Sequence, residues 1–462
     1  MIRLFKHYVP HATMLLGLVD MLCLLLAGEL AWLLRAWQIG IDPGATWARW
    51  PQLLTFAVAL QIALVAVGAY SAASFRSLRF AAARLAVAVS IGVIALSLIF
   101  FFIPALSFWR SNLLYAMAIA VLLLVAVRAA LGRALGGDTF KRRVVVLGAG
   151  ARGARVAALS RVPGVNFIVA GIVAMGEAGP VADGAVQREE IANLASYVTD
   201  LGAVEVVLAI EERRNALPVG DLLRVKTTGV QVVDLSSFLE RETGRIDLQS
   251  VNPSFLIFSD GFASGEILSS TFKRAFDIAA SLLLLLLTLP VILAAAVLIK
   301  LESKGPALYC QRRVGLYGEE FDIIKLRSMR IDAEVGGRAV WAAEDDPRVT
   351  RVGRFIRRVR IDELPQTWTV LKGEMSFVGP RPERPQFVSD LETHLPYYAE
   401  RHMVKPGITG WAQINYPYGA SIEDARNKLE YDLYYAKNYS PFLDLLILLQ
   451  TLRVVLWPEG VR

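Results

Sequence analysis

Four long apolar stretches follow one another near the N-terminus of the chain. They cover about residues 12–34, 52–73, 85–107 and 112–133. Each is close to the ~20 residues that a helix needs to cross a lipid bilayer. The first is too long, and too soon followed by further stretches, to be a cleaved signal peptide. The pattern predicts a four-span transmembrane helical bundle over residues 1–138.

Basic residues are distributed unevenly around these stretches. They precede the first stretch, separate the second from the third and follow the fourth: Arg3, Lys6, Arg76, Arg79, Arg84, Arg133, Lys141, Arg142 and Arg143. The opposite loops carry fewer basic residues, together with Trp47, Trp50 and Trp109, which suit a membrane interface. By the positive-inside rule, both ends of the bundle are expected in the cytoplasm.

From Arg142 the pattern changes to short apolar strands separated by helical segments. The segment RRVVVLGAGARGARVAALS predicts a strand, then a turn containing Gly148, Gly150 and Gly153, and then a helix. Strand-like runs at 165–174 and 203–210 alternate with helical patterns around 188–199 and 218–228. This alternation predicts an α/β, doubly wound, Rossmann-like domain over residues 139–260.

The glycine-rich turn of this middle domain allows two interpretations. It could bind a nucleotide at the helix N-terminus, or its glycines could only permit tight packing of strand against helix. A nucleotide-sugar dehydratase or epimerase using NAD would need a tyrosine and a lysine four positions apart, but Leu201 stands four positions after Tyr197. A regulatory or dimerising role is therefore expected, and a homodimer is left open.

A fifth apolar segment, residues 275–299, is also long enough to span a bilayer. Lys273 and Arg274 flank one end, and further lysines flank the other, so the charges favour neither orientation. Pro290 lies within the segment, where a proline kinks or breaks a helix. An ordinary fifth span that Pro290 only bends is one interpretation. We favour a re-entrant helical hairpin, broken at Pro290, within a region 261–301 that links the domains.

Composition supports a membrane protein, because 55% of the 462 residues are hydrophobic. The net charge of +7 is concentrated beside apolar runs, where it would meet anionic lipid or substrate rather than nucleic acid. Cys23 and Cys310 make no disulfide framework, and four scattered histidines show no HExxH spacing, so any metal should be bound through oxygen. His394 and His402 are expected on a helix surface.

Asp362 and Glu363 are adjacent carboxylates after a strongly basic run, with arginines at 348, 351, 354, 357, 358 and 360. Such a pair is often only the solvated end of a helix. In this basic field both carboxylates should stay ionised, and an ionised aspartate can attack phosphorus to form an aspartyl phosphate. Glu363 could then hold Mg²⁺, which takes one or two carboxylates together with phosphate oxygens and water.

Residues 302–462 resemble the catalytic domain of the bacterial sugar transferases. These are monotopic phosphoglycosyltransferases that prime exopolysaccharide, capsule and O-antigen assembly. Four blocks carry the resemblance: QRRVGLYGEEFDIIKLRSM, DDPRVTRVGRFIRRVRIDELPQ, GEMSFVGPRP and KPGITGWAQIN. With its membrane helices and middle domain, the whole chain is similar to the large undecaprenyl-phosphate hexose-1-phosphate transferases. Two departures are Glu319, where many members have lysine, and Leu326, where phenylalanine is usual.

The resemblance implies a mainly α-helical catalytic domain at the cytoplasmic face of the bacterial inner membrane. It implies that Asp362 attacks the β-phosphorus of a UDP-hexose, expels UMP and carries the sugar phosphate until undecaprenyl phosphate displaces it. Glucose is the default sugar, followed by galactose.

Basic and polar side chains in the matching blocks are candidates for binding the substrate. Arg381 lies between two prolines, which makes it a stiffly held clamp for phosphate, although a solvated turn is the alternative. Lys325, Arg327, Arg313 and Gln413 are weaker candidates. The runner-up function is a membrane-anchored nucleotide-binding regulator that uses Gly148–Gly153 and has an inactive transferase domain.

The arginine-rich run also has apolar residues at helical spacing, including Phe355 and Val359. It is expected to form an amphipathic helix at the membrane interface. The segment 441–457 is apolar but contains Asp444 and Arg453. It is expected either to lie at the interface or to pack against the hairpin.

Overall fold

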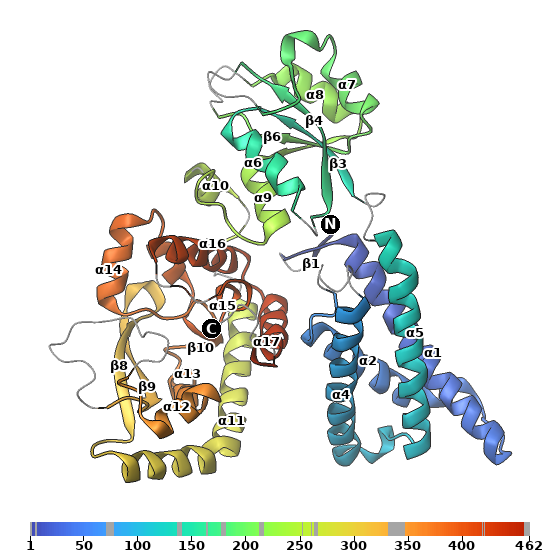
Figure 1. Ribbon diagram of the computed structural model, residues 1–462, viewed down its shortest axis with the longest axis vertical. Coiled ribbons are helices and arrows are strands. Elements are labelled where there is room, and N and C mark those ends of the chain that lie inside the picture. Colours follow the sequence, from blue (N-terminus) through green and yellow to red (C-terminus); the bar gives the residue numbers. More distant parts are fainter. Residues whose placement is uncertain are drawn as a thin grey trace. The chain divides into compact units, whose positions relative to one another are not determined.

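The structure is a computed structural model (Figure 1). It describes residues 2–4, 7–70, 78–135, 141–162, 165–176, 182–211, 217–251, 253–259, 261–262, 267–330, 347–417, 419 and 421–456. The chain divides into two compact units. One comprises Met1–Leu4 and Tyr8–Gly244, and the other comprises Phe5–His7 and Arg245–Arg462.

Apolar helices dominate the N-terminal part of the first unit. The short strands β1 (Ile2–Leu4) and β2 (His7–Val9) precede α1 (His11–Ile39), η1 (Thr46–Arg49), α2 (Trp50–Ala66), α4 (Leu78–Phe102), η2 (Pro104–Leu106) and α5 (Arg110–Leu135). By length and composition, the described residues of this region contain four candidate spans. Helix α1 packs against α2 and α5, and α2 packs against α4. The apolar N-terminal helices predicted from the sequence are confirmed.

A buried ion pair joins α1 to α5. Both terminal nitrogens of Arg128 donate to the carboxylate of Asp20, each at 2.8 Å, and the Tyr70 hydroxyl donates to the same carboxylate at 2.8 Å. Asp20 is fully buried and Arg128 nearly so. A charge in apolar surroundings is tolerated when it is paired in this way, so the pair fixes these two helices in register.

The middle of the chain forms a five-stranded parallel sheet. Its strands are β3 (Arg142–Leu147), β4 (Phe167–Ala174), β5 (Ala185–Gln187), β6 (Glu205–Leu208) and β7 (Gln231–Asp234), in the order β5-β4-β3-β6-β7. The chain starts at the central strand β3, adds β4 and β5 on one side, and then adds β6 and β7 on the other. The predicted parallel sheet is confirmed, but strands β5 and β7 were not predicted from the sequence.

Helices cover both faces of this sheet. They are α6 (Ala151–Ser160), η4 (Arg188–Glu190), α7 (Leu194–Asp200), α8 (Val219–Thr227) and α9 (Leu235–Thr243). Alternate residues of a strand point to opposite faces. Val144 of β3 therefore packs with Phe238 of α9, whereas Val145 packs with Val198 of α7. Burial on both faces explains why β3 is a continuous apolar run.

The second unit is mainly helical and carries two small pairs of strands. Its elements are α10 (Pro253–Phe258), α11 (Ile267–Glu302), β8 (Leu308–Val314), η5 (Leu316–Gly318), β9 (Glu320–Leu326), α12 (Arg351–Arg358), η7 (Ile361–Glu363), α13 (Gln366–Lys372), β10 (Ser376–Val378), α14 (Pro385–His394), η8 (Ala399–Met403), β11 (Gly407–Thr409), α15 (Trp411–Asn415), α16 (Ile422–Asn438) and α17 (Pro441–Leu456). Strands β8 and β9 pair antiparallel, and β10 and β11 pair parallel.

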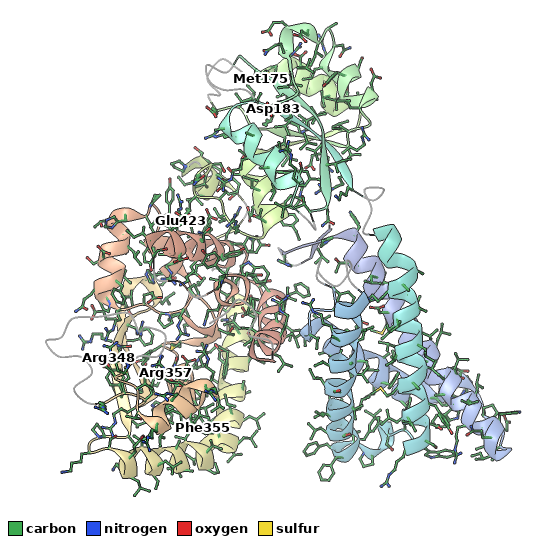
Figure 2. The ribbon with its side chains drawn as sticks, in the orientation of Figure 1. Met175, Asp183, Arg348, Phe355, Arg357 and Glu423 are labelled. Carbon is green, nitrogen blue, oxygen red and sulfur yellow. The ribbon has the colours of Figure 1, made fainter. Side chains whose placement is uncertain are left out.

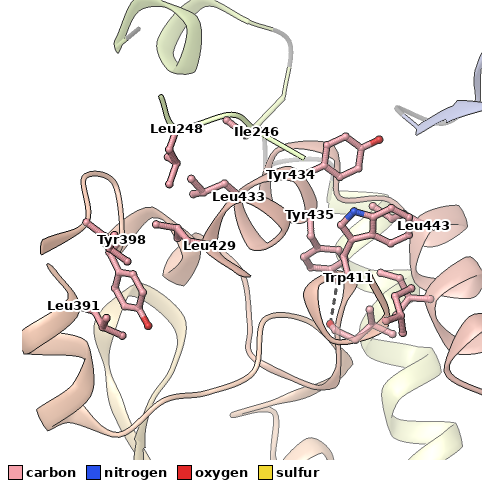
Figure 3. Packing of buried hydrophobic residues seen from close by; sticks show 14 of the residues in the cluster. Ile246, Leu248, Leu391, Tyr398, Trp411, Leu429, Leu433, Tyr434, Tyr435 and Leu443 are labelled. Atoms are coloured by element: carbon pink, nitrogen blue, oxygen red, sulfur yellow. Dashed lines mark hydrogen bonds between the residues drawn. The ribbon is translucent and has the colours of Figure 1, made fainter. Parts of the chain in front are cut away.

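Helix α16 supplies much of the core of this unit. Leu433, Tyr434 and Tyr435 are buried among residues from α14, α15 and α17 (Figure 3). The amide of Ile246 donates to the carbonyl of Glu430 at 3.0 Å, so the segment after α9 packs with α16 and not with the sheet. His402 was expected on a helix surface. That expectation is wrong, because η8 packs against α16 and His402 is only 8% exposed.

Helix α11 is the fifth candidate membrane span. It has 36 residues with Pro290 inside it, and its ribbon bends partway along (Figure 1). Near its N-terminus, Arg274 donates to the carbonyls of Val370 and Leu371 at 2.8 and 2.7 Å. Near its C-terminus, Glu302 accepts from the first two amides of α12. Both ends of α11 are therefore bonded to one folded unit.

Helix α17 also packs against the start of α11. Asp444 of α17 and Lys273 of α11 form an ion pair of 2.5 Å, and Lys273 also donates to the carbonyl of Val378. The basic residues at this end of α11, which the sequence analysis took as flanking charges at the membrane, are thus engaged in contacts within the protein. Asp444, which interrupts an apolar run, is explained by the same contact.

Candidate active site

The acidic pair lies in the single turn η7, which follows α12 at a sharp change of direction. Arg360, just before the pair, has φ 58° and ψ 19°, the left-handed region that residues other than glycine rarely adopt. Such conformations persist only where the surrounding structure enforces them, and they gather at functional sites. The turn brings both carboxylates into the space between β9 and α12, each of which contacts η7.

Three cations converge on one oxygen of Glu363. Its Oε1 lies 3.0 Å from Arg381, 3.5 Å from Lys325 and 3.8 Å from Arg360. Burial alone would raise the pKa of this carboxyl group. The combined charges outweigh burial and hold the pKa of Glu363 well below its usual range. Glu363 is therefore ionised at every pH at which the protein would work.

Lys325 occupies the next-to-last position of β9. Burial, and then the nearby charge of Arg381, lower the pKa of Lys325 to about 8, although Glu363 opposes the shift. The ammonium group is thus charged at neutral pH and loses its proton in mildly alkaline solution. This makes Lys325 the titrating cation of the pocket, since a guanidinium keeps its proton at these pH values.

Asp362 differs from its neighbour in having little neutralising contact. Its side chain is buried, with 9% of the residue exposed, and no group in the described part of the chain forms a hydrogen bond with Oδ1. Burial, and then the charge of Glu363, raise the pKa of Asp362, while Lys325 and two arginines limit the rise. A buried polar atom without a partner requires an explanation, and a ligand that binds there is one.

Gln366, at the start of α13, is buried in the same way. Its Nε2 has no hydrogen-bond partner among the described residues. It follows Asp362 by four positions, so a donor and an acceptor are both left unsatisfied close to the turn. Gln366 was not among the residues predicted from the sequence, because a glutamine at a helix start carries no signal of its own.

Of the other candidate residues, Arg313 supports the loop that carries Arg381, whereas Arg327 and Gln413 bond to backbone carbonyls elsewhere. Arg313 lies beside Arg381 and donates to the carbonyl of Pro382 at 3.0 Å, so it supports the loop that carries Arg381. Burial lowers the pKa of Arg313 to about 10. Arg327 instead donates to the carbonyls of Ser303 and Lys304, at the end of α11. Gln413 donates to the carbonyl of Ile408, close to Gly410.

Helix α12 presents an apolar and a basic surface beside η7. Phe355, labelled in Figure 2, lies on this helix. Phe355 and Val359 are 60% and 46% exposed, while Ile356 is buried against α11. Arg351, Arg354, Arg357 and Arg358 lie on the same short helix. Exposed apolar side chains between arginines are what an interfacial helix requires.

The acidic residues of this site bear on whether it could hold a magnesium ion. Among the described residues, no group of three or more acidic, histidine or cysteine side chains could hold a metal. Mg²⁺, however, is usually held by one or two carboxylates, with phosphates and water completing its shell. Glu363, which is ionised, supplies one such carboxylate.

The glycine-rich turn of the middle domain makes its close contacts with other parts of the same domain. A Cβ atom on Gly153 would lie 2.0 Å from the carbonyl oxygen of Gly148, and Gly148 has φ +112°. The amide of Ala151, which opens α6, donates to the carboxylate of Glu211 at 2.9 Å. Gly150 is the residue that precedes this helix. This geometry favours the interpretation that the glycines serve packing.

The family model for bacterial sugar transferases matches residues 268–458. A UDP-glucose:undecaprenyl-phosphate glucose-1-phosphate transferase of Caulobacter vibrioides is 44% identical over 190 residues, which cover 41% of this chain and 71% of the relative. The chain belongs to the bacterial sugar transferase family. The matched segment, residues 268–458, includes Glu363 and the three cations around it, Lys325, Arg360 and Arg381.

Two further relatives differ in the sugar that their names give. A UDP-N-acetylgalactosamine-undecaprenyl-phosphate N-acetylgalactosaminephosphotransferase of Aeromonas hydrophila is 42% identical over 271 residues, 57% of this chain and 62% of the relative. An undecaprenyl-phosphate glucose phosphotransferase of Komagataeibacter xylinus is 46% identical over 186 residues, 39% of this chain and 35% of the relative. The chain thus spans less than two thirds of the length of either.

Proposed function

We propose that this protein transfers a hexose 1-phosphate from a UDP-sugar to undecaprenyl phosphate and releases UMP. The observation that carries the proposal is the buried carboxylate of Asp362, whose Oδ1 has no partner among the described residues beside a pocket of three cations. A buried carboxylate with one oxygen left unbonded by the described residues, beside a cationic pocket, suits a nucleophile that attacks a phosphate. The names of the relatives supply the substrates.

In the first step, a carboxylate oxygen of Asp362 attacks the phosphorus that carries the sugar. A bond forms between Asp362 and that phosphorus, and the bond to the bridging oxygen breaks. UMP leaves with the electron pair, so no proton is needed for its departure. Arg381 and Lys325 would bind the phosphate oxygens on which negative charge is concentrated.

In the second step, an oxygen of undecaprenyl phosphate attacks the same phosphorus. The acyl phosphate bond breaks, Asp362 leaves as a carboxylate, and a polyprenyl diphosphate sugar is formed. Glu363 would hold Mg²⁺, which neutralises phosphate charge when it is bound. Because donor and acceptor react in turn, one site can serve a water-soluble and a lipid substrate.

The proposed place of the protein is the inner membrane of a bacterium, with the catalytic unit on the cytoplasmic side. We propose that α1, α2, α4 and α5 span the bilayer and that α11 enters and leaves it on the same face. Two observations support a re-entrant α11. Both of its ends bond to one folded unit, and a straight helix of its 36 residues would be about 54 Å long. Pro290 supplies the bend.

Labelling tests this topology directly. Cysteines introduced one at a time at Thr271 and Lys304, in a Cys23→Ala, Cys310→Ser background, would be reacted with a membrane-impermeant reagent in intact spheroplasts and in inverted vesicles. Re-entrance predicts that both positions react only in inverted vesicles. Reaction of the two positions from opposite sides would establish a fifth span instead.

The Rossmann-like strand order of the middle domain belongs to the same proposal. A parallel sheet in the order β5-β4-β3-β6-β7, covered on both faces, is the arrangement of nucleotide-binding domains. We propose that this domain takes no part in the chemistry, because its helix N-terminus already binds Glu211. Priming of exopolysaccharide, capsule or O-antigen assembly is the process that such a transferase would serve.

UMP release is the experiment that tests the function. Purified protein in detergent or nanodiscs, with Mg²⁺ and undecaprenyl phosphate, would be given UDP-glucose, UDP-galactose, UDP-N-acetylgalactosamine and UDP-N-acetylglucosamine in turn. We expect UMP from at least one donor, with turnover that depends on the lipid, and a sugar phosphate attached to Asp362 when the lipid is withheld. No UMP from any donor would refute the proposal.

A further inference from the structure

The loop that carries Arg381 is held through four consecutive carbonyls. Pro380 accepts from the amide of Gly407, Arg381 from the side chain of Arg401, Pro382 from the side chain of Arg313, and Glu383 from the amide of Val314, all at 2.9–3.0 Å. Prolines on either side of Arg381 also fix their own φ angles. The backbone of Arg381 is therefore set before any substrate arrives.

One of these four contacts comes from a buried charge. Arg401 is 5% exposed, and its Nη2 donates both to the carbonyl of Arg381 at 3.0 Å and to Asp432 at 2.7 Å. Its Nη1 donates to the hydroxyl of Tyr398 at 2.6 Å. Burying a charge is tolerated only with such compensation. The contact to the Arg381 carbonyl thus comes from a side chain that is itself fixed in two directions.

The partners of Arg401 belong to rigid parts of the unit. Asp432 lies on α16, next to Leu433, which is fully buried in the main core. Tyr398 packs its ring into the same core (Figure 3). The Arg381 side chain, in contrast, is 38% exposed and reaches Glu363. The two arginines therefore have different tasks, since one is exposed to a ligand and the other is enclosed.

We propose that Arg401, held by Asp432 and Tyr398, is a positioning residue that directs Arg381 at the phosphate being transferred. This inference rests on the proposed function, in which Arg381 binds that phosphate. Arg401 touches neither substrate nor Asp362 in this scheme, and it acts through the backbone of Arg381. The planar fork of a guanidinium lets one side chain serve three acceptors, whereas a lysine ammonium is a compact point charge.

A double-mutant cycle separates positioning from a general structural role. Arg401→Lys keeps a charge beside Asp432 and gives up the contact to the Arg381 carbonyl. We expect this change to lower kcat for UMP release by about 10- to 100-fold, because small misplacements of a clamp are costly. In an Arg381→Ala background the same change should lower kcat by less than about threefold, since the group it positions is gone.

Two further variants control the cycle. Arg245→Lys alters another arginine paired with α16, through Glu430 at 3.2 Å, and should leave kcat within about twofold. Tyr398→Phe removes one acceptor of Arg401 without leaving a charge unpaired, and should lower kcat by about three- to tenfold. This second variant carries the test if Arg401→Lys fails to fold. Equal losses in both backgrounds, or no loss at all, would overturn the inference.

Amide hydrogen exchange supplies a readout that does not depend on catalysis. In Arg401→Lys, or in Tyr398→Phe if the first variant does not fold, the peptide covering residues 376–384 should exchange faster than in wild type. Peptides from the sheet of the middle domain should be unchanged. Unchanged exchange at 376–384 would overturn the inference. A wild type that releases no UMP would refute the proposed function, while the exchange result still decides whether Arg401 positions the loop.

Discussion

Two regions of this chain look like phosphate sites in the sequence, and the structure treats them in opposite ways. In the middle domain, the helix N-terminus after the glycine-rich turn binds Glu211, and the glycines allow backbone to touch backbone. In the catalytic unit, Lys325, Arg360 and Arg381 converge on Glu363 while Oδ1 of Asp362 has no partner among the described residues. A buried polar group without a hydrogen-bond partner, more than a sequence motif, distinguishes a candidate ligand site from a well-packed turn.

The largest expected effect in this comparison is the loss of the nucleophile. Asp362→Asn should lower UMP release by roughly 10⁴-fold or more, because the proposed covalent intermediate could not form without the carboxylate. The measurement is UMP release from the best UDP-sugar. Asp390→Asn, at an exposed aspartate of α14, should have no comparable effect. A rate within tenfold of wild type for Asp362→Asn would remove the distinction drawn between the two regions.

Removing the clamp should have the next largest effect. Arg381→Ala takes away the cation nearest to Glu363 and should lower kcat/KM by about 10²- to 10³-fold. Arg312→Ala, which removes a 68% exposed arginine on β8, is the matched control and should change the rate by less than about twofold. Equal effects of the two substitutions would mean that overall positive charge matters and the geometry around Glu363 does not.

The pH dependence of kcat/KM tests whether the charge of Lys325 matters in the cationic pocket. The pKa of Lys325 is lowered to about 8, so its charge is present below that pH and is lost as the pH rises through it. We expect kcat/KM for UMP release to fall on the alkaline side, by roughly tenfold at one pH unit above the pKa of Lys325.

One variant and the position of the acid limb assign the groups that titrate in this profile. Lys325→Arg should remove the alkaline limb, because a guanidinium keeps its proton there. The acid limb should lie above the range of an ordinary aspartate, since burial raises the pKa of Asp362. An alkaline limb that persists in Lys325→Arg would assign it to another group.

The middle domain offers a test with an effect on stability alone. Gly153→Ala would force a Cβ atom against the carbonyl of Gly148 and should lower the free energy of unfolding of that domain by about 1–3 kcal/mol. Thermal unfolding in detergent, followed by proteolysis within residues 141–244, measures the change. UMP release per folded molecule should stay within about twofold. A larger loss of activity would show that this turn serves the reaction.

The smallest expected effect concerns the carboxylate that closes the turn. Glu211→Gln removes a charge from the N-terminus of α6 and should destabilise the middle domain by about 0.3–1 kcal/mol. Neither wild type nor the variant should show a higher unfolding temperature when NAD⁺ is added. A rise in the variant alone would indicate a nucleotide site that Glu211 blocks, and a rise in both would restore nucleotide binding as a function of this domain.

The sequence by itself determined the long apolar helices, the alternating strands and helices of the middle domain, and where the acidic pair falls. Apolar runs of bilayer length became α1, α2, α4, α5 and α11, because length and hydrophobicity are properties of a continuous segment. Alternation of apolar strand and helical pattern gave the parallel sheet. These features depend on neighbours along the chain. The resemblance carried by the motifs of the C-terminal region likewise identified the family.

Only the tertiary structure decided which charges meet. Lys325 and Arg327 are two positions apart and look alike in sequence, yet β9 ends at Leu326, so Lys325 faces Glu363 while Arg327 turns to the end of α11. The contact of Arg401 with Asp432 and with the Arg381 carbonyl has no local signal. Electrostatic energies depend on separation in space and on burial, and long-range folding sets both, so the sequence supplied the charges and the fold selected the pairs.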